Sequence, residues 1–199
     1  LLVAFIPTGV VGLVVKKSGM IDFMLTPSNA IWIVPIMLVI GGIFMLFCDK
    51  LFNKGTEQDE VTEKKAFWIG VIQCLSMIPG TSRSMSTIVG GMSQKLTRRS
   101  AAEFSFFLAV PTMAAATGLD VLELFVGSDA VGTGWATSEN LIMLLIGCVV
   151  AFIVALLAMK WFVSFLSKYG FKSFGWYRIA IGAFILIWML TGHSMVMFE

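Results

Sequence analysis

A short polar turn sequence, PGTSRS at residues 79–84, lies between two apolar segments and constrains the fold more than any other feature of the chain. The apolar segments on its two sides are each too short to cross a bilayer, because a spanning helix needs about 20 residues. Pro79 cannot continue a helix, and Gly80 permits the backbone angles of a tight turn. We therefore predict that residues 66–96 form a re-entrant helix–loop–helix that enters a membrane and returns to the same side.

The rest of the chain has the composition of a membrane protein. Of its 199 residues, 58% are hydrophobic and 13% are charged, and the mean hydropathy is +0.91. These values favour an all-α integral membrane protein, a multi-span helical bundle with a single membrane domain over 1–199, and disfavour a large soluble core. The apolar segments predict spans at about residues 1–15, 30–48, 101–125, 141–162 and 177–191.

The chain opens in an apolar segment that has neither an initiator methionine nor a basic n-region. A secretory signal peptide would begin with positive residues, so the first segment is interpreted as the last part of a span. We therefore predict that these residues are the C-terminal portion of a longer protein.

The distribution of lysine and arginine tests whether 66–96 turns back. If it does, every lysine and arginine except Lys16, Lys17 and Arg83 lies on one side of the membrane. If 66–96 were one complete crossing, four basic residues would stand on one side against nine on the other. The positive-inside rule favours the more lopsided arrangement. We therefore expect the hairpin to enter from the cytoplasmic side of the membrane, with the C-terminus outside.

The hexapeptide carries the groups of an anion site. Thr81 or Ser82 is a suitable N-cap for the helix that follows, and that helix directs its unpaired N–H groups and positive dipole end at the turn. Arg83 adds a planar set of donors that matches phosphate oxygens, and Ser84 and Thr87 lie near the same helix end. An arginine at membrane depth is costly without an anionic partner, so these residues predict a polar pocket for an anion.

A purely structural reading of Arg83 is also open. In that reading the guanidinium pairs with a carboxylate such as Glu103 and holds two helices together. The three cysteines lie in apolar segments at unrelated spacings and indicate neither a metal site nor a disulfide framework. The net charge of +2 gives no sign of a nucleic-acid partner.

The residues in and after the hexapeptide form a longer pattern: Gln73-Cys74, Pro79-Gly80-Thr81-Ser82-Arg83-Ser84, Thr87-Ile88 and Gly90-Gly91-Met92, then Arg98, Ala101-Ala102-Glu103-Phe104-Ser105-Phe106 and Ala109-Val110-Pro111. This pattern resembles the undecaprenyl-diphosphate phosphatase family, the bacterial bacitracin-resistance membrane enzymes, and the resemblance extends over the whole chain. The family usually has glycine after Ser-Arg-Ser. This chain has Met85 there, at the start of the predicted helix.

The resemblance implies a multi-pass inner-membrane enzyme built from inverted repeats, of which this chain would hold one re-entrant hairpin. The implied reaction removes the terminal phosphate of undecaprenyl diphosphate and so recycles the lipid carrier for peptidoglycan synthesis. Bacitracin would compete for the same lipid, and the pattern is compatible with an oligomer.

The resemblance also implies roles for individual residues. The candidate catalytic residues are Arg83, Ser82 and Ser84, with Arg83 stabilising the charge that develops during phosphoryl transfer. The candidate diphosphate-binding residues are Gly80, Thr81, Ser82, Arg83, Ser84 and Thr87. A divalent cation, Mg or Ca, is implied as a cofactor, with its ligands and the nucleophile expected upstream of Leu1, so no metal ligand is predicted in this chain.

A transporter is the rival function. Broken helices whose N-termini face a site near the membrane midplane, within inverted repeats, are also typical of secondary transporters. A carrier of a lipid phosphate or another anion would need Arg83 and no nucleophile. Without the resemblance, the residues alone leave both functions open.

Overall fold

The computed structural model describes residues 1–52, 60–126 and 137–191, except that the side chains of residues 120 and 123–126 are not described. Within these residues all regular structure is helical, which confirms the predicted all-α class. The elements in chain order are α1 (Leu2–Lys17), α2 (Met20–Leu25), α3 (Pro27–Phe52), α4 (Glu63–Gln73), the short 3₁₀ helix η1 (Cys74–Met77), α5 (Arg83–Ser93), α6 (Arg98–Val126), α7 (Ser138–Tyr169) and α8 (Lys172–Leu190).

Four of the described helices are long and apolar enough to cross a membrane, which agrees with a multi-span protein. They are Pro27–Phe52, Arg98–Leu119, Ser138–Tyr169 and Lys172–Leu190. Prolines lie inside two of them, Pro35 in α3 and Pro111 in α6, and the helices continue past both. Helix α7 begins after Thr137, whose hydroxyl accepts a hydrogen bond from the Asn140 N–H, and ends at Tyr169, before Gly170 with a φ of 71°.

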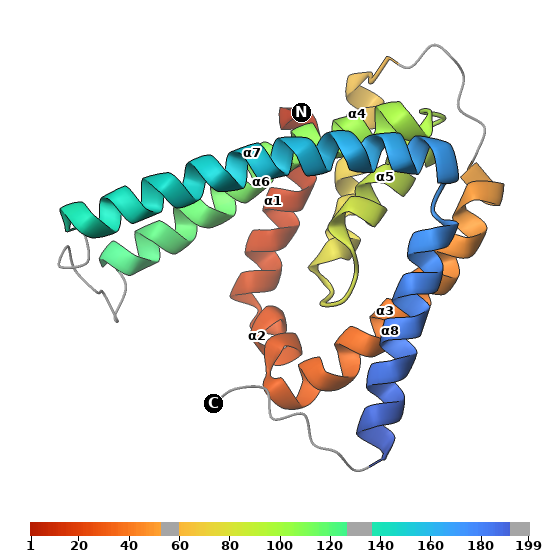
Figure 1. Cartoon of the computed structure of the whole chain (residues 1–199), viewed down its shortest axis with the longest axis horizontal. Coiled ribbons are helices and arrows are strands. Elements are labelled where there is room, and N and C mark those ends of the chain that lie inside the picture. Colours follow the sequence, from red (N-terminus) through yellow and green to blue (C-terminus); the bar gives the residue numbers. More distant parts are fainter. Residues whose placement is uncertain (53–59, 127–136, 192–199) are drawn as a thin grey trace.

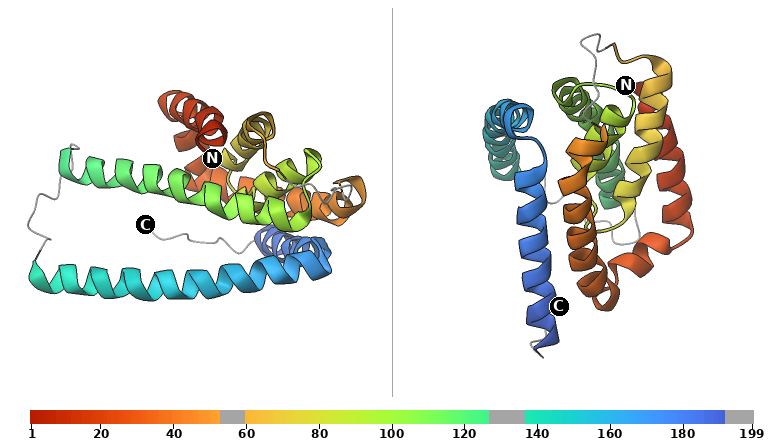
Figure 2. Two further views of the ribbon diagram at one scale, coloured as in Figure 1. Left: turned by 90° about the horizontal axis from the view of Figure 1, so that it is seen from above. Right: turned by 90° about the vertical axis from the view of Figure 1, so that its right-hand side faces the viewer.

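The hairpin of α4, η1 and α5 lies at the centre of the molecule, beside α1 and α6 (Figures 1 and 2). Helix α4 approaches α1 so closely that the carbonyl oxygen of Ala4 occupies the space a side chain at Gly70 would need. The Thr8 hydroxyl of α1 also donates a hydrogen bond to the Gly70 carbonyl oxygen at 3.1 Å. The hairpin is therefore held from within the protein, as non-helical backbone at membrane depth would have to be.

Helices α3 and α8 form a second close pair, seen side by side in Figure 1. A Cβ atom placed on Gly42 of α3 would lie 2.8 Å from the Gly175 carbonyl oxygen of α8, so the two backbones are nearly in contact there. Such packing through small residues is common between helices in membranes. It fixes the position of α8, and with it Arg178, relative to the turn after η1.

Helices α6 and α7 run side by side and extend away from α3 and α8 (Figures 1 and 2); we call this pair the α6–α7 arm. An ion pair joins the base of the arm to α3. The Asp49 carboxylate contacts Arg98 Nε at 3.0 Å and accepts a hydrogen bond from the Phe171 N–H at 2.9 Å. One side chain at the end of α3 therefore connects the start of α6 with the turn between α7 and α8.

Candidate functional site

The loop between η1 and α5 is a tight turn at Pro79 and Gly80. The Thr81 N–H donates to the Ile78 carbonyl oxygen at 3.0 Å, and Gly80 has a φ of 87°. Proline followed by a glycine with positive φ is the arrangement of a type II turn. Gly80 also faces α3, where a Cβ would lie 2.6 Å from the Val34 carbonyl oxygen. Backbone angle and space both require glycine at this position.

Ser82 is the N-cap of α5, one of the two residues that the sequence allowed for that role. Its hydroxyl accepts a hydrogen bond from the Met85 N–H at 3.3 Å. Helix α5 therefore begins at Arg83 despite the methionine at position 85, whose side chain is buried. The first turn of α5, with its unsatisfied N–H groups and positive dipole end, lies at the polar loop.

The side chain of Arg83 is turned towards α6. Its Nη1 donates to the Thr112 hydroxyl at 2.7 Å, and that hydroxyl donates in turn to the Leu108 carbonyl oxygen at 2.8 Å. The alternative pairing of Arg83 with Glu103 is not found, because Glu103 contacts Arg99 Nε at 2.9 Å, one turn away on the same helix. A guanidinium held by one neutral hydroxyl keeps most of its donors for another partner.

Thr87 also faces α6. Its hydroxyl is buried and forms a hydrogen bond with the Ser105 hydroxyl, and it can also donate to the carbonyl oxygens of Arg83 or Ser84. The predicted site residues therefore divide into two groups. Ser82 and Ser84 line a cavity beside α5, whereas Arg83 and Thr87 contact α6.

Arg178 of α8 reaches the same turn, and the sequence reasoning missed it. Its Nη2 donates to the Gly80 carbonyl oxygen at 2.6 Å, and its side chain lines the cavity together with Ser82 and Ser84. The sequence feature that could have identified Arg178 is its position near the start of a predicted span. An ionisable residue in a span is by default a candidate functional residue. In the distribution of basic residues, Arg178 contributes only one positive charge to the predicted cytoplasmic side.

Two buried polar atoms beside this turn have no hydrogen-bond partner among the described residues. They are the Thr81 hydroxyl oxygen and Arg178 Nε. Buried polar atoms in proteins are nearly always paired, so an orphan donor on a guanidinium and an orphan hydroxyl at one turn indicate a place for a polar ligand.

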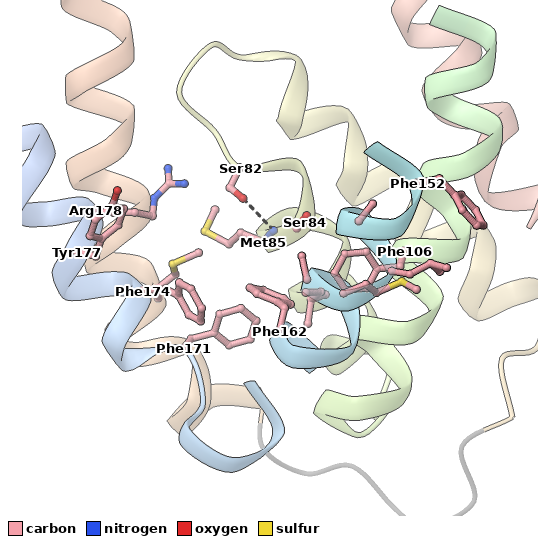
Figure 3. A pocket seen from close by; sticks show the side chains of 16 residues that line it. Ser82, Ser84, Met85, Phe106, Phe152, Phe162, Phe171, Phe174, Tyr177 and Arg178 are labelled. Carbon is pink, nitrogen blue, oxygen red and sulfur yellow. Dashed lines mark hydrogen bonds between the residues drawn. The ribbon is translucent and has the colours of Figure 1, made fainter. Parts of the chain in front are cut away.

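The cavity itself has a volume of about 670 Å³ and two chemically different ends. Ser82, Ser84, Tyr177 and Arg178 supply its polar groups. The remaining lining is apolar and combines phenylalanine with methionine and aliphatic side chains, and Figure 3 shows phenyl rings from α6, α7 and α8 along it. Within it, the rings of Phe162 and Phe174 pack with centroids 5.2 Å apart. The cavity therefore suits a molecule with a small polar head and a long apolar chain.

A divalent cation does not fit this part of the site. Among the described residues there is no group of three or more histidine, cysteine, aspartate or glutamate side chains that could hold a metal ion. The polar groups at the cavity are hydroxyls and a guanidinium. A guanidinium only donates hydrogen bonds, and Mg²⁺ and Ca²⁺ prefer carboxylate and carbonyl oxygens.

Known proteins are similar in sequence to this chain over nearly all of its length. Residues 1–184 match the family model described as bacitracin resistance protein BacA. An undecaprenyl-diphosphatase of Porphyromonas gingivalis is 49% identical over 196 residues, which cover 98% of this chain and 66% of that protein. Undecaprenyl-diphosphatases of Flavobacterium psychrophilum and Bdellovibrio bacteriovorus are 50% and 41% identical, over 94% and 99% of this chain and 67% and 72% of their own lengths. The chain thus spans about two thirds of the length of these relatives.

Proposed function

Since the chain belongs to the bacitracin resistance protein BacA family, we propose that it is part of a membrane phosphatase that hydrolyses undecaprenyl diphosphate to undecaprenyl phosphate and inorganic phosphate. The observation that carries the proposal is the cavity beside α5. It joins the hydroxyls of Ser82 and Ser84 and the guanidinium of Arg178 to a long apolar wall. The name of these relatives, undecaprenyl-diphosphatase, supports the same substrate.

The polar end of the cavity receives the diphosphate in this proposal. The first turn of α5 offers backbone N–H groups and a positive dipole end, and the hydroxyls of Thr81, Ser82 and Ser84 add donors beside it. Arg178 Nε, which is buried without a described partner, adds a charged donor from α8. Negative charge spread over phosphate oxygens matches this set of donors.

In the proposed complex, Arg83 exchanges its hydrogen bond with Thr112 for one with the diphosphate. A charge-assisted hydrogen bond to a phosphate oxygen is roughly twice as strong as one to a neutral hydroxyl, so a bound diphosphate competes well with Thr112 for the guanidinium. Arg83 then stabilises the charge that develops on the phosphoryl oxygens, which is the principal protein contribution to phosphoryl transfer. Thr87 does not contact the diphosphate in this arrangement; its hydrogen bond to Ser105 holds α5 against α6.

The apolar wall receives the prenyl chain. Its aromatic and aliphatic side chains come from α3, α5, α6, α7 and α8, so the chain would lie between the hairpin and α7. The setting proposed is the bacterial inner membrane, with the hairpin entering from the cytoplasmic side and a second, inverted repeat completing the site. Bacitracin would inhibit by competing for the same lipid. The divalent cation that the family resemblance implies would be held by residues outside the described ones.

The comparisons give the transporter alternative no support, since the curated relatives reported above carry a phosphatase name. An experiment can also distinguish a carrier from a phosphatase. A carrier would bind the lipid through Arg83 and release no phosphate, whereas a phosphatase must release it.

The experiment is inorganic phosphate release from undecaprenyl diphosphate in detergent, with the intact protein beside its Arg83→Ala variant. We expect release to fall by about two orders of magnitude or more, because losing a transition-state contact of roughly 3 kcal/mol has that effect. Lys64→Ala, an exposed lysine of α4, is the matched loss of positive charge and should leave the rate unchanged. No release from a well-folded intact protein would refute the phosphatase.

A further inference from the structure

A second cavity, of about 950 Å³, lies between the two helices of the α6–α7 arm. On α6 its lining residues, 99, 103, 106, 107 and 110, recur every three or four positions. On α7 they lie between Leu156 and Lys168 with the same spacing. This spacing places each set on one face of its helix, so the cavity is a groove bounded by two facing helix surfaces. We call it the arm groove.

The arm groove is polar at one end and apolar at the other. Helices α6 and α7 lie side by side and run in opposite directions (Figure 2), so the start of α6 adjoins the end of α7. This brings Arg99 to the same end as Ser167 and Lys168. At the other end Val110 faces Leu156. Since both helices are candidate spans, the polar end coincides with a membrane surface and the apolar end with the hydrocarbon.

The charges of the arm groove do not cancel. Arg99, Lys160 and Lys168 line it, and Glu103 is the only carboxylate among its lining residues. That carboxylate already contacts Arg99 Nε at 2.9 Å. Lys160 lies eight residues before Lys168 on α7, which corresponds to about 12 Å along the helix axis. An ammonium group at that distance from the helix end needs either an anionic partner or a side chain extended towards the surface.

We propose that the arm groove binds an anionic membrane phospholipid. Its phosphate lies between Lys160 and Lys168, within reach of the Ser164 and Ser167 side chains that line the same face of α7. One acyl chain lies along the apolar end, over Phe107 and Val110. The excess positive charge of Lys160 and Lys168 selects an anionic lipid over a zwitterionic one. This site is separate from the diphosphate site and does not rest on the proposed phosphatase activity.

The bound lipid would contact the wall of the first cavity. Phe106, Leu156 and Met159 line both cavities, so they form a partition between them. An acyl chain in the arm groove restricts the rotamers of these three side chains on one face. The lipid thereby shapes the apolar wall of the cavity beside α5 from the opposite side.

The test measures lipid binding and not activity. The intact protein in mild detergent is titrated with phosphatidylglycerol, phosphatidylcholine or undecaprenyl phosphate, and the bound lipid is counted by native mass spectrometry. The groove variant combines Lys160→Gln with Lys168→Gln, and the matched control combines the exposed Lys50→Gln with Lys64→Gln. A third variant, Val110→Trp, fills the apolar end without changing any charge, so a folding defect of the charge variant does not leave the proposal untested.

We expect phosphatidylglycerol to bind the wild type at least about tenfold more tightly than phosphatidylcholine does. The groove variant should lose about tenfold in phosphatidylglycerol affinity, Val110→Trp should also weaken it, and the control should stay within about twofold of wild type. Equal affinities in the groove variant and the control would overturn the proposal. So would tighter binding of undecaprenyl phosphate than of phosphatidylglycerol at the same residues, which would assign the groove to the prenyl lipid. Neither result depends on phosphate release, so the phosphatase proposal stands or falls separately.

Discussion

In a soluble protein the more apolar of two helices would be the more buried one, and helices α5 and α7 show the reverse. The buried residues of α5 run without a break from Met85 to Met92 and include serine, threonine and two adjacent glycines. Helix α7 is rich in leucine, isoleucine and valine, yet Leu166 is the single buried residue of its 32, all of which are described. The less apolar helix is the one at the centre of the molecule.

This difference follows from the solvent. In water, exposing apolar side chains costs free energy, and burial therefore follows hydrophobicity. Lipid tails are as apolar as leucine, so an exposed leucine costs nothing there and helix association depends on close packing and hydrogen bonds. Helix α5 supplies both, through its glycines and through the Thr87–Ser105 hydrogen bond. Helix α7 supplies apolar surface, as a helix facing lipid would.

The largest expected effect on stability is at the contact of the hairpin with α1. In Gly70→Ala the new methyl group would overlap the Ala4 carbonyl oxygen, and a backbone atom cannot swing aside as a side chain can. We expect a loss of about 3 kcal/mol in the free energy of unfolding. Titration of the intact protein with SDS in dodecylmaltoside micelles would measure it. An unchanged midpoint would mean that α4 and α1 are not in contact.

The ion pair at the base of the arm should have a smaller effect. Asp49→Ala removes both the contact with Arg98 and the acceptor for the Phe171 N–H. The two side chains keep only 10% and 22% of their exposure, so solvent screens the pair weakly and a loss of about 2 kcal/mol is expected. Asp49→Asn, which keeps an oxygen for Phe171, should lose about half as much. Equal losses in both variants would show that only the charge matters.

The hydroxyl pair between α5 and α6 comes next. Thr87→Val keeps the shape of the side chain and removes its hydroxyl, which leaves Ser105 without its partner from α5. The expected loss of stability is about 1 kcal/mol, and Thr87→Ser should recover most of it. A double-mutant cycle with Ser105→Ala measures the pair directly. A coupling energy of zero would show that these two hydroxyls do not hold α5 against α6.

The sequence predicted what depends on local chemistry and missed what depends on distant contacts. Pro79 and Gly80 predicted the turn, and the N-cap was narrowed to two residues, because both features are set by a few neighbouring residues. The partner of Arg83 was not predictable, since Thr112 lies 29 positions away on another helix. Pairing with Glu103 was chemically reasonable, but a nearer cation on the same helix, Arg99, already contacts that carboxylate.

The approach of Arg178 to the turn was equally hidden, because it depends on how α8 packs against α3. A Cβ on Gly41 of α3 would lie 3.0 Å from Arg178 Nη2, so this glycine leaves room for the guanidinium to reach Gly80. A glycine in a long apolar segment gives no indication of which side chain will use its space. The Pro79–Gly80 turn therefore has an arginine beside it from each of two helices, α5 and α8. Only Arg83, which lies within the motif, was predictable.

The smallest expected effect gives the sharpest contrast between the two regions. Gly147 lies in α7 with nothing within 4 Å of the position its Cβ would take, so Gly147→Ala makes no clash. Alanine also favours the helix over glycine by roughly 0.5–1 kcal/mol, and the variant should be unchanged or slightly more stable in the SDS titration. The same substitution thus has opposite signs at Gly70 and Gly147. If Gly147→Ala were instead as damaging as Gly70→Ala, the exposed face of α7 would be a packing surface, and the division between a buried hairpin and a lipid-facing helix would be wrong.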